Sequence, residues 1–261
     1  MTERRAGRPR RRRRGQVRAV LLDAYGTLFH YERARLGRVF RTIVEIQKLD
    51  TDPDRLFDHW TQHETAFRRR RVHRDEHGTW HREEPFRPYD AAWTECFVKA
   101  FRETEVTGGD PAAAVETLIR DLMTREVFAE TRTALDELRA RVPVGILSNA
   151  DERFLAGTLA HNEIEFETIV YSEHEKLYKP HPLLFERGLK RLGVEPSEVI
   201  YAGDSPTEDI VGATAAGIVS VWVNRDGTDW PLSEQERPNH EVTDLLGLVD
   251  IVSAGIGGAV F

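Results

Sequence analysis

A short apolar run that ends in a carboxylate is the first feature of this sequence that could carry chemistry. Val20-Leu21-Leu22 leads directly into Asp23, and the turn Gly26-Thr27 follows within a few residues. This layout is typical of an aspartate held at the carboxyl end of a buried parallel strand, where it can act as a nucleophile. The residue two places after Asp23 is Tyr25 and not a second acid, so any chemistry that needs a pair of acids here is in question.

Three further polar clusters lie beyond predicted strands. Ser148-Asn149 follows the apolar run 144–147, Lys179-Pro180 lies before a predicted helix, and the segment 203–209 contains Asp204 and Asp209. Because parallel strands bring their carboxyl ends to one edge of a sheet, and ligands bind at that edge, we expect these clusters to lie near Asp23.

The elements that must position these residues alternate along the chain from residue 142 onward. We predict strands at 17–22, 144–147, 168–171, 199–202 and 219–223, and helices at 152–161, 183–192 and 209–216. Such alternation indicates a parallel sheet with right-handed crossovers and helices on both faces. The predicted fold class is therefore α/β, with a doubly wound, Rossmann-like parallel sheet as its core.

Residues 32–125 have a different pattern, because their apolar residues recur at helical spacing with almost no strand signal. The predicted helical faces are Leu36, Val39, Phe40, Ile43 and Ile46; Leu56, Trp60, His63 and Phe67; Ala92, Cys96 and Phe97; and Val115, Leu118, Ile119 and Leu122. Pro53 and Asp110-Pro111 mark helix starts. The polar stretch 72–88 is predicted as a hairpin or long loop. We therefore predict a helical insertion at 32–125 between two core segments, 17–31 and 126–261.

Composition restricts the class of protein. The chain has 261 residues, of which 40% are hydrophobic, and this is sufficient for a substantial core. The single cysteine, Cys96, rules out an internal disulfide framework and suits a reducing compartment. No apolar run approaches the roughly 20 residues of a membrane span, and no secretory signal is recognisable. We expect a cytoplasmic protein without a membrane partner; the sequence leaves its oligomeric state open.

The first residues form an arginine-rich arm, which we place at 1–16. Arginine is found at positions 4, 5, 8, 10–14 and 18, whereas Glu3 is the single acid in this region. Like charges at this density repel and bury nothing, so we predict a disordered arm. It could make non-specific contact with nucleic acid, but a solvated tail or an over-extended start explains it more simply. The rest of the chain is acidic, so nucleic acid is not expected as the main partner.

In their order and context, the four motifs resemble those of the haloacid dehalogenase-like (HAD) hydrolase superfamily. They are Asp23-Ala24-Tyr25-Gly26-Thr27, Ser148-Asn149, Lys179-Pro180 and Gly203-Asp204-Ser205-Pro206-Thr207-Glu208-Asp209. The resemblance covers essentially residues 17–255. It implies that the helical insertion is a cap domain of the C1 type.

The resemblance also implies a role for each motif. Asp23 would form a covalent aspartyl intermediate, and the compact charge of Lys179 would bridge this nucleophile and the substrate. The catalytic residues would then be Asp23, Thr27, Ser148 and Lys179, and the substrate-binding residues would be Tyr25, Ser148 and Asn149. Mg²⁺ would be held by Asp23, Asp204, Asp209 and the main-chain carbonyl of Tyr25.

Two departures from the family pattern point in opposite directions. Tyr25 occupies the position at which HAD phosphatases usually carry an acid for the leaving group, and an Asp-x-Tyr-Gly-Thr motif is typical of the metal-independent 2-haloacid dehalogenases. However, those dehalogenases lack an acid like Asp204, and Phe185 replaces the tyrosine that typically follows their lysine. A cation would be needed to hold Asp204 beside Asp23.

We therefore favour an Mg²⁺-dependent phosphatase acting on a small phosphorylated metabolite. The alternatives are a 2-haloacid dehalogenase that uses Asp23, and a weakly active member with a binding or regulatory role. Glu208 is interpreted as solvated, with metal ligation as its second option.

The predicted insertion is rich in arginine and histidine. The positions are Arg68 to Arg71, Arg74, Arg82 and Arg87, with His59, His63, His73, His77 and His81 among them. They could form an anion-binding lid, and histidine pairs four residues apart could suggest zinc, although no further ligand set completes such a site. We favour a solvated helix face followed by a polar loop. Trp60, Trp80 and Trp93 are interpreted as core or interface residues.

Overall fold

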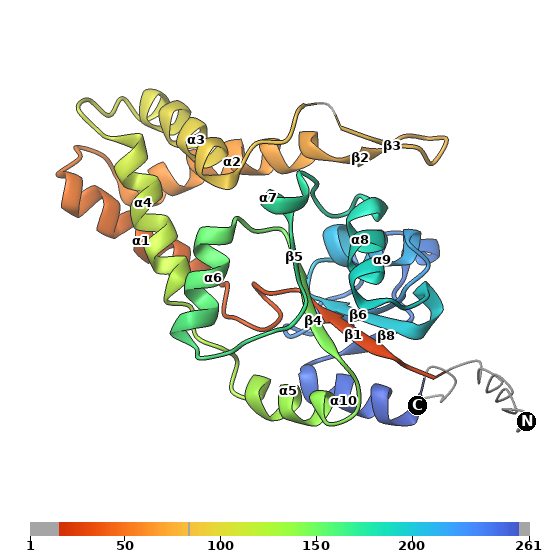
Figure 1. Ribbon diagram of the computed structural model, residues 1–261. Coiled ribbons are helices and arrows are strands. Elements are labelled where there is room, and N and C mark those ends of the chain that lie inside the picture. The colour runs from red at the N-terminus through yellow and green to blue at the C-terminus, as the bar shows by residue number, and fades with distance from the viewer. Residues whose placement is uncertain (1–15, 83, 256–261) are drawn as a thin grey trace, which may run out of the picture.

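A six-stranded parallel sheet lies at the centre of the computed structural model, which describes residues 16–82 and 84–255 (Figure 1). Its strands are β1 (Ala19–Leu22), β4 (Val144–Ser148), β5 (Ile169–Tyr171), β6 (Val199–Gly203), β7 (Val219–Val223) and β8 (His240–Val242). Their order is β5-β4-β1-β6-β7-β8, and Val20 of β1 lies opposite both Val144 and Ile200. The central strand therefore carries Asp23 at its carboxyl end.

Helices cover both faces of this sheet. They are α5 (Thr131–Arg139), α6 (Glu152–His161), α7 (Ser172–Glu175), α8 (Pro182–Leu192), α9 (Val211–Ala215) and α10 (Leu245–Ala254), with short turns η1 (Pro196–Glu198), η2 (Pro206–Ile210) and η3 (Glu234–Glu236). Alternate residues of a strand point to opposite faces. Leu21 accordingly joins the apolar cluster that includes α8 and α9, whereas Leu22 joins the cluster that includes α5, α6 and α10. The predicted doubly wound α/β fold is confirmed.

Most of the predicted core elements lie where the pattern places them, with three differences. The predicted helix at 209–216 is divided into the wide π-helical turn η2 and the short helix α9. Ser205 begins this segment, since its hydroxyl accepts the N–H of Glu208 at 3.2 Å. The helices α5 and α10 and the edge strand β8 were not predicted. The strand β8 has only three residues, none of them buried, and so has no apolar run to mark it.

Residues 33–123 form a helical segment between β1 and α5. It comprises α1 (Arg33–Gln47), α2 (Pro53–Arg71), α3 (Tyr89–Glu103) and α4 (Pro111–Met123), with a hairpin of β2 (His73–Arg74) and β3 (Trp80–His81) between α2 and α3. In Figure 1, α1 and α4 lie beside α6, and α2 and α3 lie above them, away from the sheet. Asp52 and Asp110 each lie directly before the proline that begins a helix. The side chain of each accepts two backbone N–H groups of the first helical turn, which explains why the helices begin where we predicted.

The prediction of the buried helical faces is wrong for one residue. Ile46 of α1 is 67% exposed, whereas the other members of its face are buried. Ile46 is the last residue but one of α1, beyond the part of the helix whose apolar side packs against α2 and α4.

The part of the chain that the structure describes contains no helix with the length and apolarity needed to cross a lipid bilayer. The predicted arginine-rich arm at 1–16 lies outside the described residues except for Gln16.

Asp151, at the start of α6, joins the helical segment to the core. Its carboxylate accepts the backbone N–H of Asp90, in the first turn of α3, at 3.2 Å. Burial raises the pKa of Asp151 from 3.8 to about 7. The folded state therefore binds this proton more tightly than the unfolded state, and the contribution of Asp151 to stability is lost as the pH rises from about 4 to about 7.

We expect Asp151→Asn, whose side chain does not ionise, to gain stability relative to the wild type over this pH range. The difference in free energy of unfolding should grow by up to about 1.4 kcal/mol per pH unit. Urea unfolding of both proteins at several pH values measures it. Parallel pH profiles for the two proteins would contradict this account of Asp151.

Candidate active site

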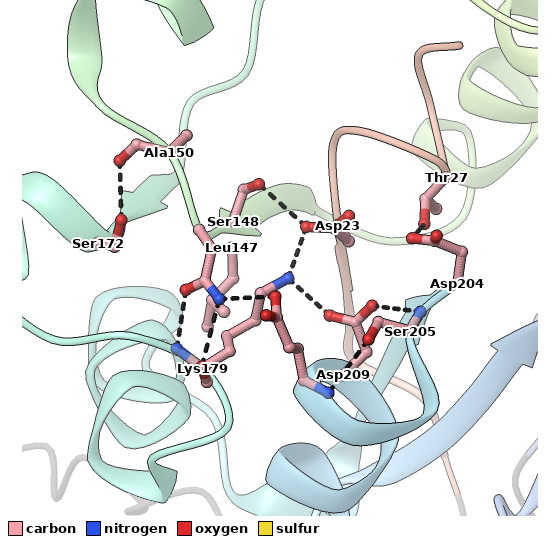
Figure 2. A network of polar contacts seen from close by, with 12 residues as sticks. Asp23, Thr27, Leu147, Ser148, Ala150, Ser172, Lys179, Asp204, Ser205 and Asp209 are labelled. Carbon is pink, nitrogen blue, oxygen red and sulfur yellow. Dashed lines mark hydrogen bonds and ion pairs between the residues drawn. The ribbon is translucent and has the colours of Figure 1, made fainter. Parts of the chain in front are cut away.

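Three carboxylates converge at the carboxyl edge of the sheet. Asp23 follows β1, Asp204 follows β6, and Asp209 lies in η2. One oxygen of each lies within 4.8 Å of one oxygen of the others, as a shared metal ion requires. Figure 2 shows Asp23 and Asp209 on either side of the Lys179 ammonium, with Asp204 nearby beside Thr27. The structure thus brings Asp23 together with Asp204 and Asp209, which lie far from it in the sequence.

Lys179 links two of the acids. Its Nζ donates to Asp23 Oδ1 at 2.5 Å and to Asp209 Oδ1 at 2.6 Å, and the side chain is 2% exposed. Lys179 and Ser148 both bind Oδ1 of Asp23, so neither of them occupies its other carboxylate oxygen. That oxygen could attack a substrate or bind a cation.

The charges of this cluster do not balance. Burial alone would lower the pKa of Lys179, but Asp209 and Asp23 outweigh this effect and raise it. Burial raises the pKa of Asp23 to about 6, and burial followed by the charges of Asp209 and Asp23 raises the pKa of Asp204 well above its ordinary value. One ammonium among three carboxylates, two of them buried and one half-buried, leaves an excess of negative charge, which favours a bound cation.

Ser148 and Asn149 connect β4 to the cluster. The Ser148 hydroxyl donates to Asp23 at 2.9 Å. The Asn149 amide binds the main chain of Lys179 twice, because its Oδ1 accepts the lysine N–H at 2.8 Å and its Nδ2 donates to the lysine carbonyl at 3.2 Å. Asn149 therefore fixes the backbone from which the Lys179 side chain extends.

Thr27, which we expected among the catalytic residues, contacts one of the three acids. It is fully buried and outside the lining of the cavity described below, and its hydroxyl donates to Asp204 at 3.3 Å. Thr27 thus orients one of the three acids.

Tyr25 lines the cavity with its ring, whereas its hydroxyl points towards α6. This hydroxyl lies 2.6 Å from Thr158 Oγ1 and donates to the carbonyl of Phe154 at 3.2 Å. Burial raises the pKa of Tyr25 further above its ordinary value. The phenol is consequently a poor proton donor for a leaving group.

Two glycines allow the acids to lie against the backbone. A Cβ atom on Gly26, whose φ is +94°, would lie 2.4 Å from a carboxylate oxygen of Asp204. A Cβ atom on Gly203 would lie 2.3 Å from the carboxyl carbon of Asp209. Both distances are below any real contact, so the two acids occupy the space that side chains would otherwise fill.

Sequence reasoning missed Tyr201, which extends from β6 beneath the cluster. Its hydroxyl accepts from Lys179 at 2.9 Å and lies 2.7 Å from Asp209 Oδ1, to which it donates. A tyrosine within an otherwise apolar buried strand was the available signal, because a buried hydroxyl needs a partner.

Our interpretation of Glu208 as solvated was wrong. Its carboxylate forms an ion pair with Arg71 of α2 and accepts from Asn149 at 2.9 Å. Burial opposes its charged form, but Arg71 and then Arg68 outweigh this and lower the pKa of Glu208 to about 2. The interpretation of the α2 arginines as a solvated face is correspondingly wrong for Arg71, which is 5% exposed, and holds for Arg69, which is exposed.

We expect Arg71→Gln to lower the free energy of unfolding by about 3 kcal/mol, because it leaves the half-buried carboxylate of Glu208 without its main counter-charge. Arg69→Gln on the same helix is the matched control and should change stability by less than about 0.5 kcal/mol. Urea unfolding without divalent ions measures both. Equal midpoints for the two variants would show that the ion pair contributes nothing.

A cavity of about 310 Å³ opens beside these groups. Its charged and polar lining includes Asp23, Arg68, Ser148, Asn149, Lys179, Asp204, Ser205, Glu208 and Asp209. Tyr89, Trp93 and Leu122 of α3 and α4 contribute to the remaining walls. The predicted site residues other than Thr27 therefore share one cavity between the core and the helical segment.

Comparison with known proteins agrees with this arrangement. A family model described as a haloacid dehalogenase-like hydrolase matches residues 17–217. The chain belongs to this family. The match includes β1, the helical segment, and the loops that carry Ser148, Lys179, Asp204 and Asp209.

The relatives of this HAD-like hydrolase include both phosphatases and a dehalogenase. It is 32% identical over 166 residues to a phosphoserine phosphatase of Thermus thermophilus, covering 59% of this chain and 65% of the relative. It is 33% identical over 114 residues to haloacetate dehalogenase H-2 of a Moraxella species, covering 42% of this chain and 50% of the relative. The chain thus matches between half and two thirds of the length of these two proteins.

The fold also matches solved HAD structures. A HAD hydrolase of Bacillus subtilis with bound magnesium superimposes with a TM-score of 0.74 at 20% identity, covering 91% of this chain and 99% of that structure. At this level of identity the similarity concerns the fold alone.

Proposed function

We propose that this hydrolase is a magnesium-dependent phosphatase that acts on a small phosphorylated metabolite through an aspartyl-phosphate at Asp23. The observation that carries the proposal is the charge of the cluster, in which three carboxylates surround one buried ammonium. A divalent cation would neutralise this excess. A dehalogenase that works without metal has no use for Asp204 beside Asp23.

The donor set fits Mg²⁺, which prefers hard oxygen ligands and usually keeps several waters. Asp23, Asp204 and Asp209 would hold the ion, and the family pattern adds the main-chain carbonyl of Tyr25. The close approach of Asp204 to Gly26 and of Asp209 to Gly203 supports this assignment, because no side chain intrudes between the acids and the backbone. When bound, the ion would supply positive charge to the phosphoryl oxygens.

The residues of the chain would carry out two displacements. Lys179 holds Oδ1 of Asp23, so the other carboxylate oxygen would attack phosphorus while the bond to the leaving oxygen breaks. Lys179, and the Ser148 hydroxyl after it turns from Asp23, would stabilise the phosphoryl oxygens. Water would then attack phosphorus, releasing phosphate and restoring the Asp23 carboxylate.

The helical segment would act as the cap over this site. Arg68 of α2, Tyr89 and Trp93 of α3, and Leu122 of α4 all line the cavity beside Asp23. They would exclude water and select the leaving group, as cap residues do in a closed active site.

A metal-independent 2-haloacid dehalogenase is the second candidate. Tyr25 in the first motif and the similarity to haloacetate dehalogenase H-2 favour it. Halide leaves without a proton, so this reaction would not need an acid at position 25.

Metal removal separates the candidates. We expect phosphate release from a panel of phosphorylated metabolites in Mg²⁺, and a fall of at least about 100-fold in EDTA that added Mg²⁺ reverses. Chloride release from 2-chloropropionate that is unaffected by EDTA would support the dehalogenase instead. A protein with neither activity would fit a binding or regulatory role and would overturn the proposal.

A further inference from the structure

The cavity beside Asp23 has a second half that differs in chemistry from the acid cluster. Its wall is formed by Tyr25, Tyr31, Tyr89, Trp93, Leu122 and Phe154. The rings form a continuous surface, with centroid separations of 4.7 Å for Tyr89–Trp93, 5.7 Å for Trp93–Phe154 and 5.8 Å for Tyr25–Phe154. A leaving group bound to phosphorus at Asp23 would therefore lie among aromatic rings.

The hydroxyls of Tyr25 and Tyr89 already have partners, whereas Trp93 Nε1 has none among the described residues. The Tyr25 hydroxyl binds Thr158 and Phe154, and the Tyr89 hydroxyl accepts from Arg71 at 2.5 Å. A leaving group rich in hydroxyls would find few partners here, and each unpaired hydroxyl would cost binding energy.

The cationic side chain nearest this half is not free for a second anion. Arg68 forms an ion pair with Glu64 of its own helix and lies 3.7 Å from Glu208. The aromatic half of the cavity thus suits an apolar, flat group better than a sugar or a second acid.

The carboxylates that line the cavity already have partners of their own. Within residues 16–82 and 84–255, its carboxyl groups are those of Asp23, Asp204, Asp209 and Glu208. The first three form the acid cluster, and the Glu208 carboxylate is paired with Arg71 and accepts from Asn149. A phenol-type oxygen departs as a stable anion, whereas an alkoxide needs a proton.

We infer that the substrates are aryl phosphomonoesters, whose phenol-type leaving group is bound by the aromatic half of the cavity. This inference rests on the proposed phosphatase function. The oxygen of Asp23 would bond to phosphorus as the phosphorus–oxygen bond to the ring breaks. The aryl oxide would leave with the electron pair and take its proton from solvent.

Binding of two phosphonates tests the inference without any effect of leaving-group acidity, because neither compound reacts. In calorimetry with Mg²⁺ present, phenylphosphonate should bind about 30-fold more tightly than ethylphosphonate, since the larger ring buries more apolar surface. Equal dissociation constants in the wild-type protein would overturn the inference.

Two tryptophan variants locate the effect. Trp93 lines the cavity, whereas Trp60 does not, and each is 3% exposed. We expect Trp93→Leu to reduce the preference for phenylphosphonate by about 10-fold and Trp60→Leu to leave it unchanged. An equal loss in both variants would contradict the assignment to this cavity.

Acetyl phosphate separates this inference from the proposed function, because its leaving group has no ring. Failure to hydrolyse it in Mg²⁺ would count against the phosphatase itself. Hydrolysis of acetyl phosphate without a preference for phenylphosphonate would overturn only the aryl assignment.

Discussion

Asp23→Asn is expected to lower the rate of phosphate release by at least about 10⁴-fold while the protein remains folded. The amide has nearly the same shape as the carboxylate, and its oxygen can still accept from Ser148 and Lys179. It cannot, however, displace the leaving oxygen from phosphorus. Steady-state phosphate release in Mg²⁺ measures the effect, with circular dichroism to verify the fold.

Asp136→Asn is the matched control, because Asp136 is exposed on α5 and lies outside the cavity. It should retain wild-type activity. If Asp23→Asn kept more than a trace of activity in the same assay, Asp23 could not be the nucleophile. Mass spectrometry of wild-type protein quenched during turnover should also detect a phosphoryl group on the peptide that contains Asp23.

Lys179→Met is expected to have the second largest effect, on both stability and activity. Without the ammonium, Asp23 and Asp209 lose their shared counter-charge in a buried site, so we expect a loss of about 3–5 kcal/mol in the absence of divalent ions. Mg²⁺ should restore part of this stability by neutralising the same acids. Activity should fall by about 10²–10³-fold even with Mg²⁺, because the charge that contacts the nucleophile is missing.

Lys190→Met, on the exposed face of α8, controls for the loss of a lysine. Urea unfolding of both variants with and without Mg²⁺ gives the comparison. If the two variants had the same stability in EDTA, Lys179 would not be neutralising the acid cluster.

The core of the fold could be predicted because its strands are short apolar runs whose neighbours in sequence are helices. The edge strand β8 could not, since it contains His240, Glu241 and a single apolar residue, the half-buried Val242, and so has no apolar run. Ile46 shows the limit of periodicity, because the pattern identifies a helix face but not where along the helix its contacts end.

The acid cluster could be predicted because Asp23 and Asp204 follow directly after strands and Asp209 lies in the turn that follows Asp204. The contacts that fix it were harder to anticipate. Glu208 and Arg71 are distant in sequence, and no local sequence pattern indicates that they form an ion pair. Tyr201 gave a signal, a hydroxyl within a buried strand, but its partner Lys179 lies on a loop whose path the sequence does not reveal.

The central position of β1 has a consequence for the order in which the protein can assemble during synthesis. Val20 pairs with Val144 on one side and with Ile200 on the other, so both neighbours of β1 emerge from the ribosome long after it. Such distant pairing makes folding slow and leaves a strongly apolar strand without partners in the meantime. The helical segment, built from local contacts, can form first. Asp23 therefore reaches its final environment only after nearly the whole sheet has been made.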